Sequence, residues 1–293
     1  MSTQPDHSRF AVSTWSLHRT LGRPPFTGPD SPEEKPTNGA NSDALPLLDL
    51  PARLREFGIP KLEICHFHIP TRDSAYLQQL RAALETNEIT LWQLLIDGGD
   101  ITHPDHAARD IAWIQSWIDT AATLGATRVR VSGGKAEPSP EAFKRSNAAL
   151  AALADYAAAR NVRLLTENWQ TLLATPEAVF AVLDGLDHVG LLADLGNWSG
   201  PTKYDDLAQI LPRAESCHAK AHFDATASGN NAIATASGNN AIATAMDRVD
   251  YTRCLEICRS ADFQGPYSLI YDGPNADEWA GLRAEMAVVA AYL

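Results

Sequence analysis

The sequence predicts a single (β/α)8 TIM barrel domain over residues 1–293. Short apolar, β-branched runs alternate with longer amphipathic segments at least seven times, which predicts βαβ units and a parallel sheet. Neither GxGxxG nor GxxxxGK[ST] follows any of the apolar runs, which disfavours the alternative, a doubly wound open sheet. At roughly 150 residues per domain the length suggests two domains, but α/β barrels of this size are routinely one.

The expected strands are the short runs of this pattern. They cover residues 10–14, 61–65, 90–96, 127–132, 162–167, 189–194, 216–221 and 267–271. The expected helices fill the intervals. They cover residues 43–57, 72–87, 105–124, 140–160, 176–183, 204–211, 250–260 and 278–291. Two helix starts carry a capping hydroxyl followed by proline and an acid, Ser139-Pro140-Glu141 and Thr175-Pro176-Glu177.

Two stretches interrupt the alternation. Residues 21–42 are rich in Pro, Gly, Asn and Asp and follow the first strand, so we expect a long loop at the mouth of the barrel. Residues 225–233 read ATASGNNAI, and the same nine residues recur at 234–242. Two units are too few for a solenoid, so we expect residues 225–245 to form a low-complexity insertion in the loop after strand seven.

Composition excludes several classes of protein. The chain is 45% hydrophobic and 20% charged, which is typical of a globular protein and not of a disordered one. Its net charge of −12 and the lack of a Lys/Arg run argue against a nucleic-acid partner. The polar first ten residues and the lack of long apolar runs predict no signal peptide and no membrane partner. With only four scattered cysteines, we expect a cytoplasmic protein with reduced thiols.

Polar residues end three consecutive strands. Strand five ends in Glu167, strand six ends in Asp194, and strand seven contains His218. Active sites of these barrels form at the carboxyl ends of the strands, so the three side chains are expected to meet there. Two carboxylates and an imidazole suit one divalent ion, Mn²⁺ first, with Mg²⁺, Co²⁺ and Zn²⁺ as alternatives. A single acid at a strand exit is often only a cap or an ion-pair partner, but three in succession favour a metal or catalytic site.

The sequence resembles the xylose isomerase-like TIM barrels, which include sugar phosphate isomerases and epimerases. The resemblance covers most of the chain. Its most specific pieces are Glu167-Asn168, Asp194-Leu195-Gly196-Asn197 and His218-Ala219-Lys220, supported by the segments STWSL at 13–17, LEIC at 62–65 and VRVSGG at 129–134. The family binds one divalent metal through Glu, Asp, His and a final Glu, and the resemblance implies the first three in Glu167, Asp194 and His218.

The fourth position departs from the family pattern. Ile270 stands where the family usually has a glutamate, and an isoleucine cannot ligate a metal. Asp272 has the same strand parity and lies one pleat further out, so it is a candidate replacement as ligand and as acid or base. The other two possibilities are a reaction that needs only one protein base, Glu167, and a barrel that binds a sugar without catalysis.

The resemblance implies an isomerase or epimerase of a small sugar or sugar phosphate, with proton transfer through a metal-stabilised ene-diolate. Loss of a β-hydroxyl instead would make the protein a sugar or cyclitol dehydratase. A non-catalytic sugar-binding barrel is the third alternative. A phosphodiesterase like the apurinic-site endonucleases is disfavoured, because it needs several metals and a basic groove. A homo-oligomer is compatible with all of these.

Further residues near the strand exits are candidates with ordinary packing or capping roles as alternatives. Lys220 shares the parity of His218 and is a candidate catalytic residue that neutralises an enolate or a phosphate. Candidate substrate-binding residues are histidines, tryptophans and amides at strand ends, together with one arginine. They are His66, His68, His222, Trp15, Trp169, Trp198, Asn168, Asn197 and Arg130.

Overall fold

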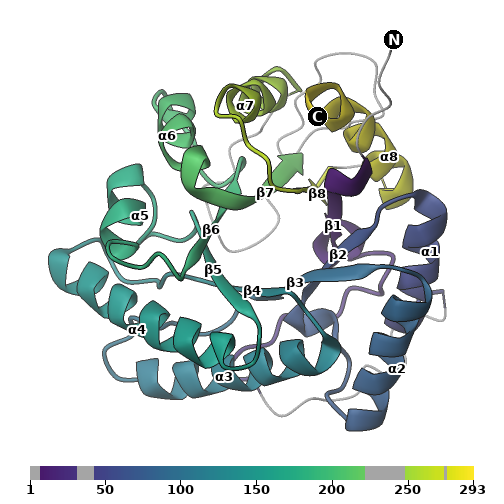
Figure 1. The fold of residues 1–293 in the computed structure, drawn as a ribbon, viewed down its shortest axis with the longest axis horizontal. Coiled ribbons are helices and arrows are strands. Elements are labelled where there is room, and N and C mark those ends of the chain that lie inside the picture. The colour runs from purple at the N-terminus through teal and green to yellow at the C-terminus, as the bar shows by residue number, and fades with distance from the viewer. Residues whose placement is uncertain (1–6, 32–42, 222–247, 274–275) are drawn as a thin grey trace.

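The computed structural model describes residues 7–31, 43–221, 248–273 and 276–293. Eight parallel strands pair in chain order, and the eighth pairs with the first, so the sheet closes into a barrel. Figure 1 shows the strands at the centre and the helices in a ring around them. The predicted (β/α)8 barrel with a single domain is therefore confirmed.

The strands are the inner layer of the fold. They are β1 (Phe10–Ser13), β2 (Lys61–Cys65), β3 (Thr90–Ile96), β4 (Arg128–Val131), β5 (Arg163–Glu167), β6 (Gly190–Asp194), β7 (Ala214–Ala221) and β8 (Tyr267–Tyr271). The α-helices of the described residues are the outer layer. They are α1 (Leu50–Phe57), α2 (Ser74–Thr86), α3 (Ala107–Leu124), α4 (Pro140–Ala158), α5 (Pro176–Val182), α6 (Lys203–Ile210), α7 (Arg248–Ser260) and α8 (Glu278–Val289).

Local chemistry explains where two helices begin. The Ser139 hydroxyl accepts the Ala142 amide at 3.2 Å and the Thr175 hydroxyl accepts the Ala178 amide at 3.3 Å, as predicted for the two capping residues. The first helix, expected from residue 43, begins only at Leu50. Pro46 is extended and Pro51 occupies the first turn, and the backbone between them forms a short 3-10 turn. A proline disfavours the helical region for the residue before it, here Leu45, and Pro46 itself is extended, so a helix cannot run from residue 43 through this segment.

The two expected irregular segments are described only in part. Residues 21–31 of the first loop form turns and irregular chain beside the barrel mouth, whereas residues 32–42 lie outside the described residues. The repeat insertion at 225–245 lies wholly outside them. In the part of the chain that the structure describes, no helix combines the length and apolar character of a membrane span.

The main hydrophobic core lies between the barrel and the helices. The outward-facing strand residues Val12, Leu62, Leu94, Val129 and Leu269 belong to one large buried cluster with the inner faces of the helices. The barrel interior is different, because buried polar side chains fill its carboxyl end. They include Glu63, Gln93, Arg130, Glu167, Asp194 and His218. The apolar packing outside the barrel thus fixes the strands that carry the polar side chains inside it.

One buried acid lies outside this polar interior. Glu285 on α8 is fully buried, and its carboxyl oxygen Oε1 accepts a hydrogen bond from the Tyr251 hydroxyl at 3.0 Å. Burial raises the pKa of Glu285 well above its ordinary value of 4.5, although the Tyr251 hydrogen bond opposes this. The folded protein therefore keeps the carboxyl protonated above the pH at which the unfolded chain releases the proton.

We predict that Glu285 lowers stability as pH rises. Above about pH 4.5 the folded state binds one proton more than the unfolded state, so the free energy of unfolding falls with pH until the folded pKa is passed. The Glu285→Gln variant has no titratable group at this position, so its stability does not depend on this proton. Urea unfolding between about pH 4.5 and pH 8 should show wild type losing stability relative to the variant.

The matched control is Glu177→Gln, which changes an exposed acid in the first turn of α5. Its stability difference from wild type should vary little with pH. A Glu285→Gln difference that stays constant over the same range would contradict the prediction.

Candidate metal centre

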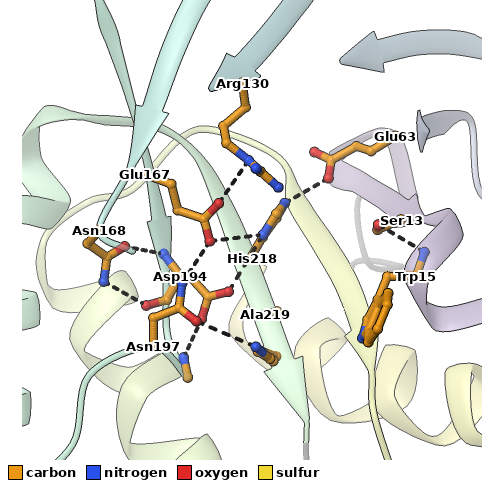
Figure 2. A network of polar contacts seen from close by, with 12 residues as sticks. Ser13, Trp15, Glu63, Arg130, Glu167, Asn168, Asp194, Asn197, His218 and Ala219 are labelled. Carbon is orange, nitrogen blue, oxygen red and sulfur yellow. Dashed lines mark hydrogen bonds and ion pairs between the residues drawn. The ribbon is translucent and has the colours of Figure 1, made fainter. Parts of the chain in front are cut away.

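Three side chains from neighbouring strands meet at the carboxyl end of the barrel. Glu167 ends β5, Asp194 ends β6 and His218 lies in β7, and all three are buried. One potential ligand atom from each lies within 4.8 Å of the other two. Figure 2 shows the three side chains pointing toward one another. The structure thus brings together the three residues that the sequence predicts as metal ligands.

Glu63 holds His218 on the side of its ring that faces away from Glu167 and Asp194. Its Nε2 atom lies 2.8 Å from Oε2 of Glu63 on β2, and the other carboxylate oxygen of Glu63 accepts a hydrogen bond from the Gln93 amide at 2.7 Å. Nε2 therefore carries the proton that Glu63 accepts. The opposite nitrogen, Nδ1, faces Glu167 Oε1 at 3.7 Å and Asp194 Oδ2 at 3.6 Å. These distances are too long for good hydrogen bonds, so the three atoms border a common space.

Glu167 is fixed from two sides. Arg130 on β4 places its Nε 2.9 Å from Glu167 Oε2 and its Nη1 2.6 Å from Asp97. The Asn197 amide donates to Glu167 Oε1 at 2.8 Å. Arg130 is almost fully buried, and its guanidinium lies near the Trp169 ring at 5.2 Å from the ring centre. The carboxylate of Glu167 consequently has one fixed orientation.

The surrounding charges shift the pKa of two of the cluster residues. Burial alone would raise the pKa of Asp194, but the positive charge of Lys220 and the imidazole of His218 hold it well below its usual range. Burial disfavours a charged His218, but Glu63, Asp194 and Glu167 outweigh it and raise the pKa of His218 well above its usual value. The cluster therefore attracts positive charge.

The residues present fit a divalent ion. Four buried carboxyl groups gather here, from Glu63, Asp97, Glu167 and Asp194, against two basic side chains, Arg130 and Lys220. With a neutral His218 the excess is two negative charges, which one divalent ion would balance. Separations of 3.6 and 3.7 Å also suit two ligands of one ion, each about 2.0–2.3 Å from it.

Comparison with known proteins assigns the family. The model of the family "Xylose isomerase-like TIM barrel" matches residues 51–292. The chain belongs to this family. It is the family that the motifs around Glu167, Asp194 and His218 resemble, so that prediction is confirmed. No protein of curated function matches the chain at a significant level of sequence similarity.

Solved structures of several relatives share the family barrel at low sequence identity. One is a D-psicose 3-epimerase with D-tagatose from Clostridium cellulolyticum H10 (13% identity, 96% of each chain covered, TM-score 0.65). Another is a xylose isomerase-like TIM barrel protein from Mycobacterium smegmatis in complex with magnesium (16% identity, 99% of this chain and 97% of that one, TM-score 0.63). A third is the probable 3-DHS dehydratase AsbF from Bacillus anthracis (14% identity, 95% and 98%, TM-score 0.65). At such identities the likeness concerns the fold.

Three of the predicted polar residues, Lys220, Asn168 and Asn197, lie beside the cluster. Lys220 Nζ is 3.4 Å from Asn197 Oδ1, and its aliphatic chain lies against Gly196, where an added Cβ would approach the Lys220 side chain to 3.0 Å. Asn168 is buried and bonds both backbone groups of Asp194, at 3.1 and 2.7 Å. Asn168 therefore positions the Asp194 backbone, whereas Lys220 and Asn197 border the cluster itself.

The three candidate tryptophans differ in their surroundings. Trp15 is 37% exposed at the end of β1 and stacks on His18. Trp169 is partly buried over Arg130. Trp198 is only 6% exposed, belongs to the hydrophobic core and donates its indole N–H to the Leu173 carbonyl at 3.0 Å. Of the three, Trp198 has the contacts of a packing residue.

Both candidate histidines after β2 are buried and hydrogen-bonded at each ring nitrogen. His66 Nε2 lies 2.8 Å from the Thr27 carbonyl, and its Nδ1 accepts the Asp97 amide at 3.3 Å. His68 lies 2.9 Å from the Thr14 hydroxyl and 3.0 Å from His18. Burial lowers the pKa of each imidazole. The structure gives them a role in fixing the loops, and substrate contact stays a prediction.

Two further predictions are not tested by the geometry. Asp272 follows β8 and is exposed, and among the described residues the converging ligand atoms are those of Glu167, Asp194 and His218 without Asp272. Its roles as ligand and as acid or base stay predictions. His222 lies outside the described residues.

Sequence reasoning missed Glu63, Gln93 and Asp97. Glu63 lies inside the apolar run KLEIC and Gln93 inside TLWQLLI, and a polar residue in such a strand is unusual unless it faces a polar interior. Because side chains alternate between the two faces of a strand, the inward-facing positions of Glu63 and Gln93 could have been predicted from the sequence. The partner of Glu63 on β7, His218, is 155 residues away in the chain, and only the closed barrel brings the two together.

We predict that the protein binds about one divalent ion per chain. Protein equilibrated with Mn²⁺ and desalted should retain the ion, and Asp194→Asn should lose most of it, because the variant removes a charged ligand. The control Asp155→Asn removes an exposed acid and should keep the ion. Background metal in wild type, or full retention in Asp194→Asn, would be the contrary result.

We also predict that Arg130 is essential for stability. Arg130→Met leaves Asp97 and Glu167 buried without their cation, which should cost about 3–5 kcal/mol in metal-free urea unfolding. Arg163→Met is the control, because its pair with Glu215 is partly exposed and should cost about 1 kcal/mol or less. Equal losses in the two variants would contradict the prediction.

Proposed function

We propose that the protein is a divalent-metal-dependent isomerase or epimerase of a small sugar or sugar phosphate. The observation that carries this proposal is the convergence of Glu167, Asp194 and His218 at the carboxyl end of the barrel. Membership of the xylose isomerase-like TIM barrel family supports it, as does the likeness in fold to a D-psicose 3-epimerase. Mn²⁺ is our preferred ion, and the magnesium complex of the Mycobacterium smegmatis protein, which shares the fold, supports a hard divalent cation.

Glu167, Asp194 and His218 would hold the ion in this proposal. When bound, the ion would act as a Lewis acid toward a substrate carbonyl and make the neighbouring C–H more acidic. Glu167 is the protein group for proton removal, because Arg130 and Asn197 orient its carboxylate at the rim of the cluster. Lys220 lies where its positive charge would stabilise an oxyanion that forms on the substrate.

Other residues would bind and orient the substrate. Trp15 offers a partly exposed aromatic face at the end of β1, and Trp169 offers another above Arg130. Asn197 bridges Lys220 and Glu167, so it couples the position of the Glu167 carboxylate to that of the Lys220 ammonium group. A small-molecule substrate, a cytoplasmic location and homo-oligomer formation remain parts of the same proposal.

A dehydratase of the same fold is the second candidate, favoured by the similarity to the dehydratase from Bacillus anthracis. Both reactions begin with removal of a proton next to a carbonyl. They differ in whether the proton returns to carbon or a hydroxide leaves. A sugar-binding barrel without catalysis is the third candidate.

We predict exchange of a substrate proton with solvent. Candidate ketoses, aldoses and their phosphates are incubated with the Mn²⁺-loaded protein in D₂O and followed by NMR. A substrate should lose the C–H signal next to its carbonyl, and Glu167→Gln should slow this exchange about 10²–10⁴-fold because the base is gone.

The control for this experiment is Glu177→Gln, an exposed acid that is not among the converging ligand residues, which should exchange at the wild-type rate. Exchange with retention of all hydroxyl groups supports an isomerase or epimerase, and formation of an unsaturated product supports the dehydratase. Saturable sugar binding by the metal-loaded protein with no exchange for any substrate would overturn the enzymatic proposal.

A further inference from the structure

Strand β8 carries an apolar residue, Ile270, beside the polar residues of the cluster. Across β7 and β8, His218 pairs with Ser268 and Lys220 pairs with Ile270. Residues paired across neighbouring strands point to the same side of a sheet, so Ile270 faces the barrel interior with Lys220 and His218. Ile270 is 4% exposed, and unlike its neighbours Leu269 and Tyr271 it is not part of the core beneath the helices.

Ile270 also lies at the height of the cluster. Glu167 on β5 pairs with Leu192, one pleat below Asp194, and Asp194 then pairs directly with His218. His218 pairs with Ser268, and Ile270 is one pleat above Ser268. Because strands in a barrel are staggered in one direction, the residues of one layer are Glu167, Asp194, His218 and Ile270. Three of these four positions carry donor atoms, and the β8 position carries a hydrocarbon.

A buried carboxylate lies on the side of His218 that faces away from the cluster. Glu63 is fully buried on β2 and contacts His218 at the nitrogen opposite the common space. A carboxylate that accepts the second N–H of a ligating histidine fixes its tautomer and makes its other nitrogen a stronger donor. Gln93 holds the remaining oxygen of Glu63 and so keeps the carboxylate aimed at the ring.

We infer that Glu63 is a positioning residue that, through His218, supplies the negative charge which the β8 strand lacks at Ile270. This inference rests on the proposed function, because it assumes that the cluster binds a divalent ion. Glu167, Asp194 and His218 would then hold the ion without a donor atom from Ile270 on β8. Glu63 contacts His218 and not the reacting atoms, so its effect is on metal binding.

The experiment is a double-mutant cycle on metal affinity, read out by titration calorimetry with Mn²⁺ and without any substrate. Glu63→Gln should weaken Mn²⁺ binding about 10–100-fold, the range for loss of a partner behind a ligating histidine. Ile270→Glu introduces a carboxylate on β8 and should tighten binding. In the Ile270→Glu background, the loss caused by Glu63→Gln should shrink to about 5-fold or less, because the two charges substitute for each other.

The control is Thr166→Val. Thr166 is fully buried on β5 next to Glu167, but its hydroxyl points away from the cluster and donates to the Val131 carbonyl at 3.1 Å. This variant should lose stability and keep the wild-type affinity for Mn²⁺. It thereby separates damage to the barrel from damage to the metal site.

The outcomes distinguish the inference from the proposed function. A wild-type protein that binds no Mn²⁺ overturns both. If wild type binds Mn²⁺ and the affinity of Glu63→Gln is within about 2-fold of the wild-type affinity, only the role of Glu63 is overturned. If Glu63→Gln causes the same loss of affinity in the wild-type and Ile270→Glu backgrounds, the compensation for Ile270 is overturned. If Glu63→Gln does not fold, Gln93→Leu removes only the donor that aims Glu63, and an affinity no weaker than wild type then refutes the inference.

Discussion

The arrangement of this protein depends on like charges that are brought together inside the barrel. Glu63, Glu167 and Asp194 approach His218 from three directions, and all four side chains are buried. Buried carboxylates are costly unless a cation or a hydrogen bond satisfies them. Arg130, Lys220 and the histidine itself provide part of this compensation. A divalent ion would complete it, so the charges that make the cluster costly also favour the binding of a cation.

The fold supplies the rigidity that such a site requires. Each polar residue of the cluster lies in a strand whose outward neighbours pack into the core, for example Leu62 and Ile64 beside Glu63. The hydrogen bonds from Asn168 to the Asp194 backbone tie β5 to β6 at the level of the ligands. The side chains therefore have little freedom to separate when they repel each other.

Periodicity and strand ends were sufficient to predict the barrel and the three converging residues, because a parallel sheet places all carboxyl ends on one face. They were not sufficient for contacts across the barrel. Glu63 on β2 and His218 on β7 lie five strands apart in chain order and three apart across the closure of the barrel, and their pairing depends on closure and stagger, which no local pattern contains. Trp198 shows the same limit, because a tryptophan after a strand can line a pocket or enter the core, and here its indole is bonded inside the core.

The central claim is that Glu167, Asp194 and Nδ1 of His218 bind one divalent ion. It is tested most directly by a crystal structure of protein grown with Mn²⁺, with anomalous scattering used to locate the metal. The account predicts one strong peak about 2.0–2.3 Å from all three ligands, with the His218 Nε2 hydrogen bond to Glu63 preserved. A peak bound elsewhere, or three side chains turned away from an ion-free centre, would contradict it.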